Sequence, residues 1–275
     1  MGGFGLYIHW PFCESKCPYC DFNSHVSRTV DQNQWLSAYL TEIDRIKSLT
    51  GNRVLNTVFF GGGTPSLMDP EIVHKILDHV HKTWPCANEM EITLEANPSS
   101  VEARRFQGYA QAGVNRISMG IQALNDTDLR RLGRIHTHQE ARNAFDIARS
   151  VFDRVSFDLI YARPAQTLDE WARELDRAID LAADHLSLYQ LTIEQGTPFF
   201  DLHKRGKIRV PEAREKKLFF FLQKCDQNPL PQRPFFCGKL AKIIEEKIKI
   251  GAERRIKIWS VWASLSSPPD SPFPA

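Results

Sequence analysis

Three cysteines near the start of the chain have the side-chain type and spacing to hold a metal centre. Cys13, Cys17 and Cys20 form a C-x3-C-x2-C loop. Each iron of a [4Fe–4S] cluster needs a ligand and thiolates are the usual choice, so three close cysteines could bind three irons and leave the fourth open. A zinc site with His25 as a fourth ligand is one alternative, although structural zinc usually takes two separated ligand pairs. The other alternative is that the three thiols are unrelated.

Further groups that could meet a ligand lie in or after predicted strands. The three glycines Gly61–Gly63 stand just before Thr64. Because they lack side chains, a ligand could approach their backbone closely. The alternative is that they form an ordinary turn. Glu95 and Asp158 fall in strand-like segments where apolar residues would be usual. Because an unpaired buried carboxylate is costly, we expect each to meet a ligand or a basic side chain.

Short apolar segments alternate with longer helical patterns from residue 6 to residue 191. The predicted strands are Leu6–Trp10, Thr57–Phe60, Glu91–Glu95, Arg116–Gly120, Val155–Ile160 and Leu186–Leu191. Each interval leaves room for a crossover helix, which favours parallel pairing. The sequence therefore predicts an α/β fold, a partial (β/α)6 barrel with an irregular C-terminal tail. Its ligands should lie at the carboxyl ends of the strands.

Helix signals occupy the intervals. Asp69 followed by Pro70 predicts a helix start, and Ser99–Glu102 and Thr167–Glu170 are predicted capping boxes. Two stripes at helical spacing should pack on the sheet. They consist of Leu36, Tyr39, Leu40 and Ile43, and of Ile72, Val73, Ile76, Leu77 and Val80.

Charge separates the end of the chain from the rest. The whole chain has a net charge of +2, but residues 201–275 carry 16 Lys and Arg against 8 Asp and Glu. After about Pro211 the strand–helix alternation stops and prolines become frequent. We predict a barrel domain over 1–210 and a divergent, basic, partly disordered tail over 211–275, with a short amphipathic helix near 240–248.

The sequence also indicates the cellular location of the protein. The chain has no apolar run of about 18 residues and no secretory signal, so we predict a cytoplasmic protein without stable membrane insertion. Clustered cysteines in that setting more often hold metal than form disulfides. The basic tail matches no nucleic-acid-binding module, so we expect no nucleic-acid partner.

Several segments together resemble the HemW-type haem chaperones of the radical S-adenosylmethionine (SAM) superfamily, relatives of oxygen-independent coproporphyrinogen III oxidase. The resemblance covers about residues 5–210. It is carried by residues 7–13 (YIHWPFC), 20–25 (CDFNSH), 60–65 (FGGGTP), 95–98 (EANP), 115–122 (NRISMGIQ), 132–136 (LGRIH) and 157–160 (FDLI). It implies a radical SAM barrel with a [4Fe–4S] cluster on Cys13, Cys17 and Cys20, and SAM bound at the open iron.

The resemblance also implies the residues that contact SAM. They are Gly62, Gly63 and Thr64 for its amino end, Glu95, Gln122, Arg134 and Asp158 for its ribose, adenine or carboxylate, and Tyr7 and Tyr19 for stacking or backbone contacts. The alternative for Arg134 is that it is a solvated cation on the protein surface. His9 is either a core histidine or a group that supports the site.

Phe22 bears on the choice between chaperone and oxidase. It stands where the related oxidases carry a further cysteine, and the chain begins only a few residues before its first strand. Both features favour a chaperone that binds haem and delivers it to acceptor apo-proteins, over an oxidase that decarboxylates a porphyrinogen. The expected partners are haem or porphyrin, those apo-proteins and an electron donor.

The tail departs from this family after about Pro211. It lacks the family's His-Asn-x-x-Tyr-Trp segment, and the last histidine of the chain is His203. Cys225 and Cys237 remain as thiolate candidates for a haem iron, although lone cysteines are more often inert. We expect a C-terminus replaced through a shifted reading frame or recombination, with a divergent accessory domain as the alternative. Haem should therefore bind weakly and without an axial imidazole.

Overall fold

The structure is a computed structural model that describes residues 4–27, 29–99, 103–182, 185–212, 215–217 and 219. Its centre is a six-stranded parallel sheet in the order β1-β4-β5-β6-β7-β8. The strands are β1 (Phe4–Trp10), β4 (Leu55–Gly62), β5 (Cys86–Ala96), β6 (Arg116–Gln122), β7 (Arg154–Tyr161) and β8 (His185–Gln190). The six predicted strands and the partial (β/α)6 barrel are confirmed.

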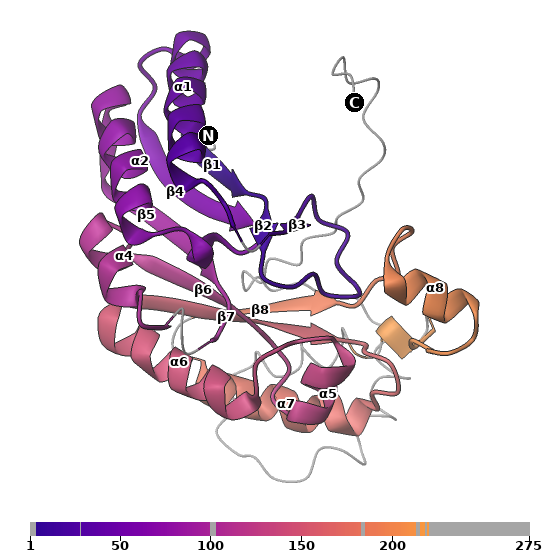
Figure 1. Cartoon of the computed structure of the whole chain (residues 1–275). Coiled ribbons are helices and arrows are strands. Elements are labelled where there is room, and N and C mark those ends of the chain that lie inside the picture. Colours follow the sequence, from indigo (N-terminus) through magenta and orange to yellow (C-terminus); the bar gives the residue numbers. More distant parts are fainter. Residues whose placement is uncertain are drawn as a thin grey trace, which may run out of the picture.

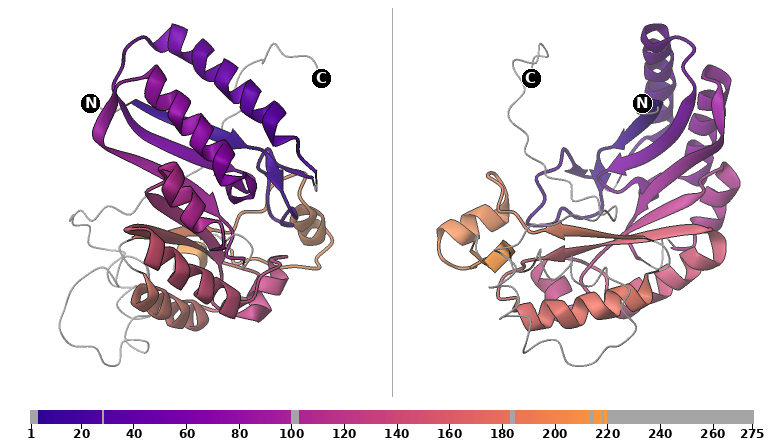
Figure 2. Two further views of the ribbon diagram at one scale, coloured as in Figure 1. Left: turned by 60° about the vertical axis from the view of Figure 1, so that its left-hand side comes forward. Right: turned by 180° about the vertical axis from the view of Figure 1, so that it is seen from behind.

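Helices cover the outer face of the curved sheet, and within the described residues no helix covers its inner face (Figures 1 and 2). The covering helices are α1 (Gln32–Thr50), α2 (Pro70–Thr83), α4 (Phe106–Ala112), α6 (His138–Val151) and α7 (Leu168–Leu181). Shorter helices follow the carboxyl ends of the strands. They are the 3-10 turn η1 (Pro65–Leu67), α5 (Asp126–Arg131) and α8 (Pro198–Lys204).

The predicted helix starts are confirmed in part. Thr167 caps α7, where its hydroxyl accepts from the Glu170 amide and the Glu170 carboxylate accepts from the Thr167 amide. Asp69 is the cap residue of α2 with Pro70 after it, but its side chain accepts no hydrogen bond from the helix. Instead its amide donates to the side chain of Gln32 at 2.8 Å. The capping box at Ser99–Glu102 extends outside the described residues.

The apolar stripes pack as expected between the sheet and the helices. All five stripe residues of α2 are buried, and Ile43 is the buried member of the α1 stripe. Beyond the predicted domain boundary, Phe219 is also buried, with its ring stacked on Tyr161 at 6.4 Å. Cys225, Cys237 and the helix predicted near 240–248 lie outside the described residues. Within the described part of the chain, no helix is long and apolar enough to cross a membrane.

The inner face of the sheet is polar. Along β5, Ile92 and Leu94 are buried, while Glu91 and Glu95 alternate with them and remain partly accessible. Arg116 of β6 pairs with Glu91 at 3.0 Å, and Arg154 of β7 contacts the same carboxylate. Since side chains alternate along a strand, this pattern directs charged groups into the open interior of the barrel.

Candidate functional site

The cysteine loop is a closed segment that begins just after β1. Its ends pair in parallel as β2 (Phe12–Cys13) and β3 (His25–Val26). The His25 amide donates to the Pro11 carbonyl at 2.7 Å, and inside the loop the Cys20 amide donates to the Cys17 carbonyl at 3.0 Å. These backbone hydrogen bonds hold the three cysteines on one short, folded segment. Its two end strands, β2 and β3, lie side by side (Figure 1).

A lysine inside the loop closes it further. Lys16, between the first two cysteines, donates from Nζ to the carbonyls of Phe22 and Ser24, each at 3.1 Å. On the other side of the loop end, His9 Nε2 lies 2.9 Å from the Asn23 carbonyl. The exit of the loop is thus held by side chains from its own first half and from β1.

The three thiols are free. Cys13 is buried, Cys17 and Cys20 are half-buried, and burial raises the pKa of the Cys20 thiol. Among the described residues, no three His, Cys, Asp or Glu side chains already surround a point that could hold a single metal ion. His25, the alternative zinc ligand, is exposed. The donor set of the loop is therefore three thiols, which suits an iron–sulfur cluster.

The glycines at the end of β4 have a packing role that the sequence does not reveal. Gly62 has a φ of +117°, and a Cβ there would lie 2.6 Å from Nδ1 of His9. A Cβ on Gly63 would lie 2.6 Å from the Phe12 carbonyl oxygen and 3.0 Å from Sγ of Cys13. The glycines let the β4 loop approach the cysteine loop, and the same bare backbone is open to a ligand.

Two carboxylates lie close together on the inner face of the sheet. Burial, reinforced by the charge of Asp158, raises the pKa of Glu95 to about 7. Burial also raises the pKa of Asp158 to about 7, and its Oδ1 is buried with no hydrogen-bond partner. Glu95 accepts one bond from the Gly62 amide at 3.2 Å. Burial, reinforced by the charges of Asp158 and Glu95, raises the pKa of Tyr189 to about 12.

Arg134 connects the strand ends to the cysteine loop. Its Nη1 donates to Sγ of Cys17 at 3.2 Å, and its Nη2 donates to the Asn97 side-chain oxygen at 2.6 Å and to the Gly120 carbonyl at 2.9 Å. Asn97 in turn donates to the Thr64 hydroxyl at 3.2 Å. Arg134 is therefore a bound, partly buried cation, not a solvated surface one.

The other predicted contacts are distributed around this centre. Gln122 ends β6 with a φ of +76°, and its side-chain oxygen is buried with no partner. Tyr7 is 56 % exposed and stacks on Phe59, while burial and the Glu95 charge raise the pKa of its hydroxyl. The ring of Tyr19 packs toward α8, 6.1 Å from Phe199.

Sequence reasoning missed or left out several residues of this region. His9 contacts both the glycine loop and the end of the cysteine loop, Asn97 joins Thr64 to Arg134, and Tyr189 lies by the carboxylates. A signal existed for two of them. His9 follows Tyr7 by two residues in β1, and Asn97 follows Glu95 by two residues just after β5, so each is expected on the same face as a predicted contact.

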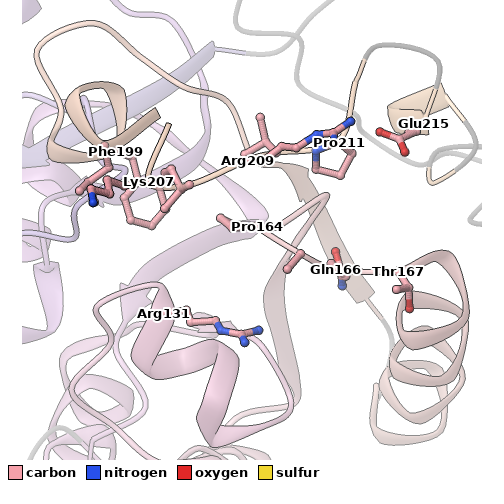
Figure 3. A pocket seen from close by; sticks show the side chains of 13 residues that line it. Arg131, Pro164, Gln166, Thr167, Phe199, Lys207, Arg209, Pro211 and Glu215 are labelled. Atoms are coloured by element: carbon pink, nitrogen blue, oxygen red, sulfur yellow. The ribbon is translucent and has the colours of Figure 1, made fainter. Parts of the chain in front are cut away.

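A cavity of about 600 Å³ lies apart from this centre, between the loop before α7, α8, residues 207–211 and Glu215 (Figure 3). Arg131, Lys207 and Arg209 contribute basic groups to its lining. None of the predicted cluster or SAM contacts lines it. The candidate site is therefore the open inner face beside the cysteine loop.

Comparisons with known proteins agree with this geometry. Residues 7–178 match the model of the Radical SAM superfamily. The chain is 41 % identical over 208 residues to the protein named "Radical S-adenosyl methionine domain-containing protein 1, mitochondrial" of Bos taurus, covering 75 % of this chain and 47 % of that protein. It is 46 % identical over 200 residues to "Heme chaperone HemW" of Haemophilus influenzae, covering 70 % and 52 %.

A solved structure matches as well. Coproporphyrinogen III oxidase (HemN) from Escherichia coli, described as a radical SAM enzyme, superimposes with a TM-score of 0.70 at 26 % identity, covering 82 % of this chain and 52 % of that one. The chain spans about half the length of the curated relatives it matches.

Proposed function

Because the chain belongs to the radical SAM superfamily, we propose that Cys13, Cys17 and Cys20 hold a [4Fe–4S] cluster with SAM bound beside it. The observation that carries this proposal is unsatisfied polarity next to the loop. The side-chain oxygen of Gln122 and Oδ1 of Asp158 are both buried without partners. Buried polar atoms are normally hydrogen-bonded, so a polar ligand between these strand ends would account for both.

The side chains suit the parts of SAM in turn. Glu95 and Asp158 are acceptors for ribose hydroxyls, and Gln122 can pair with the adenine edge. Arg134 can pair with the carboxylate, and the bare backbone at Gly62 admits the amino end. When bound and reduced, the cluster supplies the electron that cleaves the C–S bond of SAM. The protein's own part is to hold SAM in place and to exclude water from it.

The wider activity that we propose is that of a haem chaperone, which binds haem and passes it to acceptor apo-proteins, with an electron donor serving the cluster. Its support is the name of the relatives, "Heme chaperone HemW", at up to 46 % identity, against 26 % for the oxidase structure. Phe22, 64 % exposed, adds no fourth thiol to the loop. A cytoplasmic location stays a prediction.

Binding of labelled SAM to the reconstituted protein in anaerobic equilibrium dialysis tests the site. We expect Arg134→Leu to weaken binding at least tenfold with iron content retained, because it removes the cation that bridges Cys17 and the strand ends. The matched control is Arg142→Leu, which removes an exposed arginine paired with Asp146 on α6. Wild-type protein with a full cluster and no affinity for SAM would contradict the proposal.

Haem titration and a carbon dioxide assay separate chaperone from oxidase. With the tail lacking histidine, we expect weak haem binding whose spectrum lacks an axial imidazole. We also expect no carbon dioxide release from coproporphyrinogen III under reducing, anaerobic conditions. Turnover of the porphyrinogen would assign the protein to the oxidases, and tight stoichiometric haem binding would place the haem site within the barrel.

A further inference from the structure

A buried ionic network lies at the rim of the barrel between β6 and β7. Arg163 is 2 % exposed and Glu174 is 1 % exposed. Nη2 of Arg163 donates to Glu174 Oε2 at 2.5 Å and to Asp128 Oδ2 at 2.9 Å, and Nη1 donates to the Ile160 carbonyl at 2.7 Å. Arg163 and Glu174 are called the rim clamp below. Buried ion pairs rarely add stability over apolar packing. We therefore ask whether this pair fixes the position of the segments that it joins.

The rim clamp connects two neighbouring strand ends. The second oxygen of Glu174 accepts from the Leu124 amide at 2.7 Å. Leu124 lies two residues after Gln122 at the end of β6, and the bonded Ile160 lies two residues after Asp158 in β7. The clamp thus holds both strands just beyond Gln122 and Asp158, each of which has one buried side-chain oxygen without a partner.

The pairing of β6 with β7 is irregular near the end of β6. The β6–β7 register shifts just before Gln122, whose φ is +76°. The Gly120 carbonyl accepts from the Arg134 side chain at 2.9 Å, and the Ile121 carbonyl from His136 Nε2 at 3.1 Å. A left-handed residue with a side chain costs roughly 1–2 kcal/mol and persists where its surroundings fix it.

Backbone strain collects at the β7 end too. Among the described residues, those other than glycine with positive φ are Gln122, Ala162 and Ala165. The two alanines flank Arg163, with φ values of +57° and +61°. Residues with positive φ therefore lie at both of the strand ends that the clamp joins.

We propose that Arg163 and Glu174 are positioning residues for SAM, which fix the separation of the strand ends that carry Gln122 and Asp158. The clamp acts through the Leu124 amide and the Ile160 carbonyl and touches neither ligand nor cluster. This inference rests on the proposed SAM site, so its test also includes a measurement that needs no SAM.

Two substitutions at Glu174 form a matched pair. Both remove the charge opposite Arg163, but Glu174→Gln keeps an acceptor for the Leu124 amide, whereas Glu174→Met has a similar length and no acceptor. Dissociation constants for SAM are measured at about 10 °C on anaerobically reconstituted protein with full iron content. We expect Glu174→Met to bind SAM at least tenfold more weakly than wild type, and Glu174→Gln within about threefold.

Hydrogen exchange on the apo chain reports on the clamp directly. We expect the Leu124 amide to lose protection in Glu174→Met and to keep it in Glu174→Gln, with the rest of β6 unchanged. Thr167→Ala is the stability control, because it removes the α7 cap at a cost of about 1 kcal/mol without touching Leu124. It should lower the melting temperature and leave the SAM dissociation constant unchanged.

The outcomes are distinct. Wild-type SAM affinity in Glu174→Met with an unprotected Leu124 amide would overturn the inference, and so would equal losses of affinity in Thr167→Ala and Glu174→Met. If Glu174→Met does not fold, Arg163→Lys replaces it, since one ammonium cannot reach the Ile160 carbonyl and both carboxylates together. A wild type that fails to bind SAM would refute the proposed site, while the exchange data would still decide whether the clamp holds β6.

Discussion

The two sides of the candidate site are built in opposite ways. The cysteine-loop side is one contiguous segment, closed by backbone hydrogen bonds between β2 and β3, with two of its three thiols half-exposed. The strand-end side draws on β5, β6 and β7, buries charged and amide groups, and includes strained backbone at Gln122. The first side offers donors to a metal, and the second holds unsatisfied polarity suited to an organic ligand.

Because the two sides are built from different segments, substitutions on one side should have different effects from substitutions on the other. A change in the cysteine loop should remove iron and, with it, any ligand bound at the iron. A change at the strand ends should leave iron in place and weaken SAM.

Replacing any one of Cys13, Cys17 or Cys20 with Ala should reduce iron from about four per chain to near zero after anaerobic reconstitution, because each corner of the cluster needs its ligand. Iron analysis and the visible absorption band measure this. Cys86→Ala is the control, since this free thiol lies in β5, outside the loop. Retained cluster in all three loop variants, or stoichiometric zinc in the wild type, would contradict the assignment.

Gly62→Val should destabilise the fold by roughly 2–4 kcal/mol, since it adds a branched side chain at positive φ against the ring of His9. Urea denaturation measures the loss. Gly51→Ala is the matched control: its φ is also positive, at +64°, but a Cβ there meets nothing within 4 Å, so only the strain of about 1 kcal/mol should remain. Equal losses in the two variants would show that the close packing beside the cysteine loop is unimportant.

Asp158→Asn should weaken SAM binding about tenfold or more while it stabilises the apo protein at pH 8. The pKa of Asp158 is about 7 in the fold, against roughly 3.9 unfolded, so the folded state holds more protons and stability falls as the pH rises from about 4 to 7. The neutral Asn side chain removes this loss of stability at high pH. The free energy of unfolding of Asp158→Asn should therefore exceed that of wild type by roughly 1–2 kcal/mol at pH 8, and the difference should vanish near pH 4. Thermal melts at both pH values measure it; a destabilised variant at pH 8 would contradict the role of burial.

Ala165→Gly should raise the free energy of unfolding by about 0.5 kcal/mol. Ala165 is exposed with a φ of +61°, so glycine relieves left-handed strain without leaving a cavity, and its greater unfolded entropy offsets part of the gain. Chemical denaturation detects a change of this size only in parallel measurements with wild type. A loss of stability would show that the rim backbone is not strained there.

Much of this fold could be predicted because its signals are local. The strand intervals, the stripe on α2 and the capping box at Thr167 each follow from neighbouring residues, and the cysteine spacing is readable in eight positions. Asp69 shows the limit of such patterns. The sequence marks it as a cap, but its carboxylate makes no capping bond and lies 3.8 Å from the Arg105 guanidinium instead.

The strand-end side could not be worked out in the same way. Arg134 was assigned through resemblance, while its bonds to Cys17, Asn97 and Gly120 join four separate segments and have no local signal. Arg163 likewise has no pattern that predicts its burial, since an arginine after a strand is usually a surface residue. Only the packed structure shows that such residues face inward.

The electron paramagnetic resonance spectrum of the reduced cluster, recorded with and without SAM, shows whether SAM reaches the open iron. If the cysteine loop and the strand ends enclose one SAM molecule, its amino and carboxylate groups reach the open iron, and the wild-type spectrum changes on addition of SAM. The change should weaken in Asp158→Asn, which keeps all its iron. A wild-type spectrum that stays the same with four irons present would contradict the account.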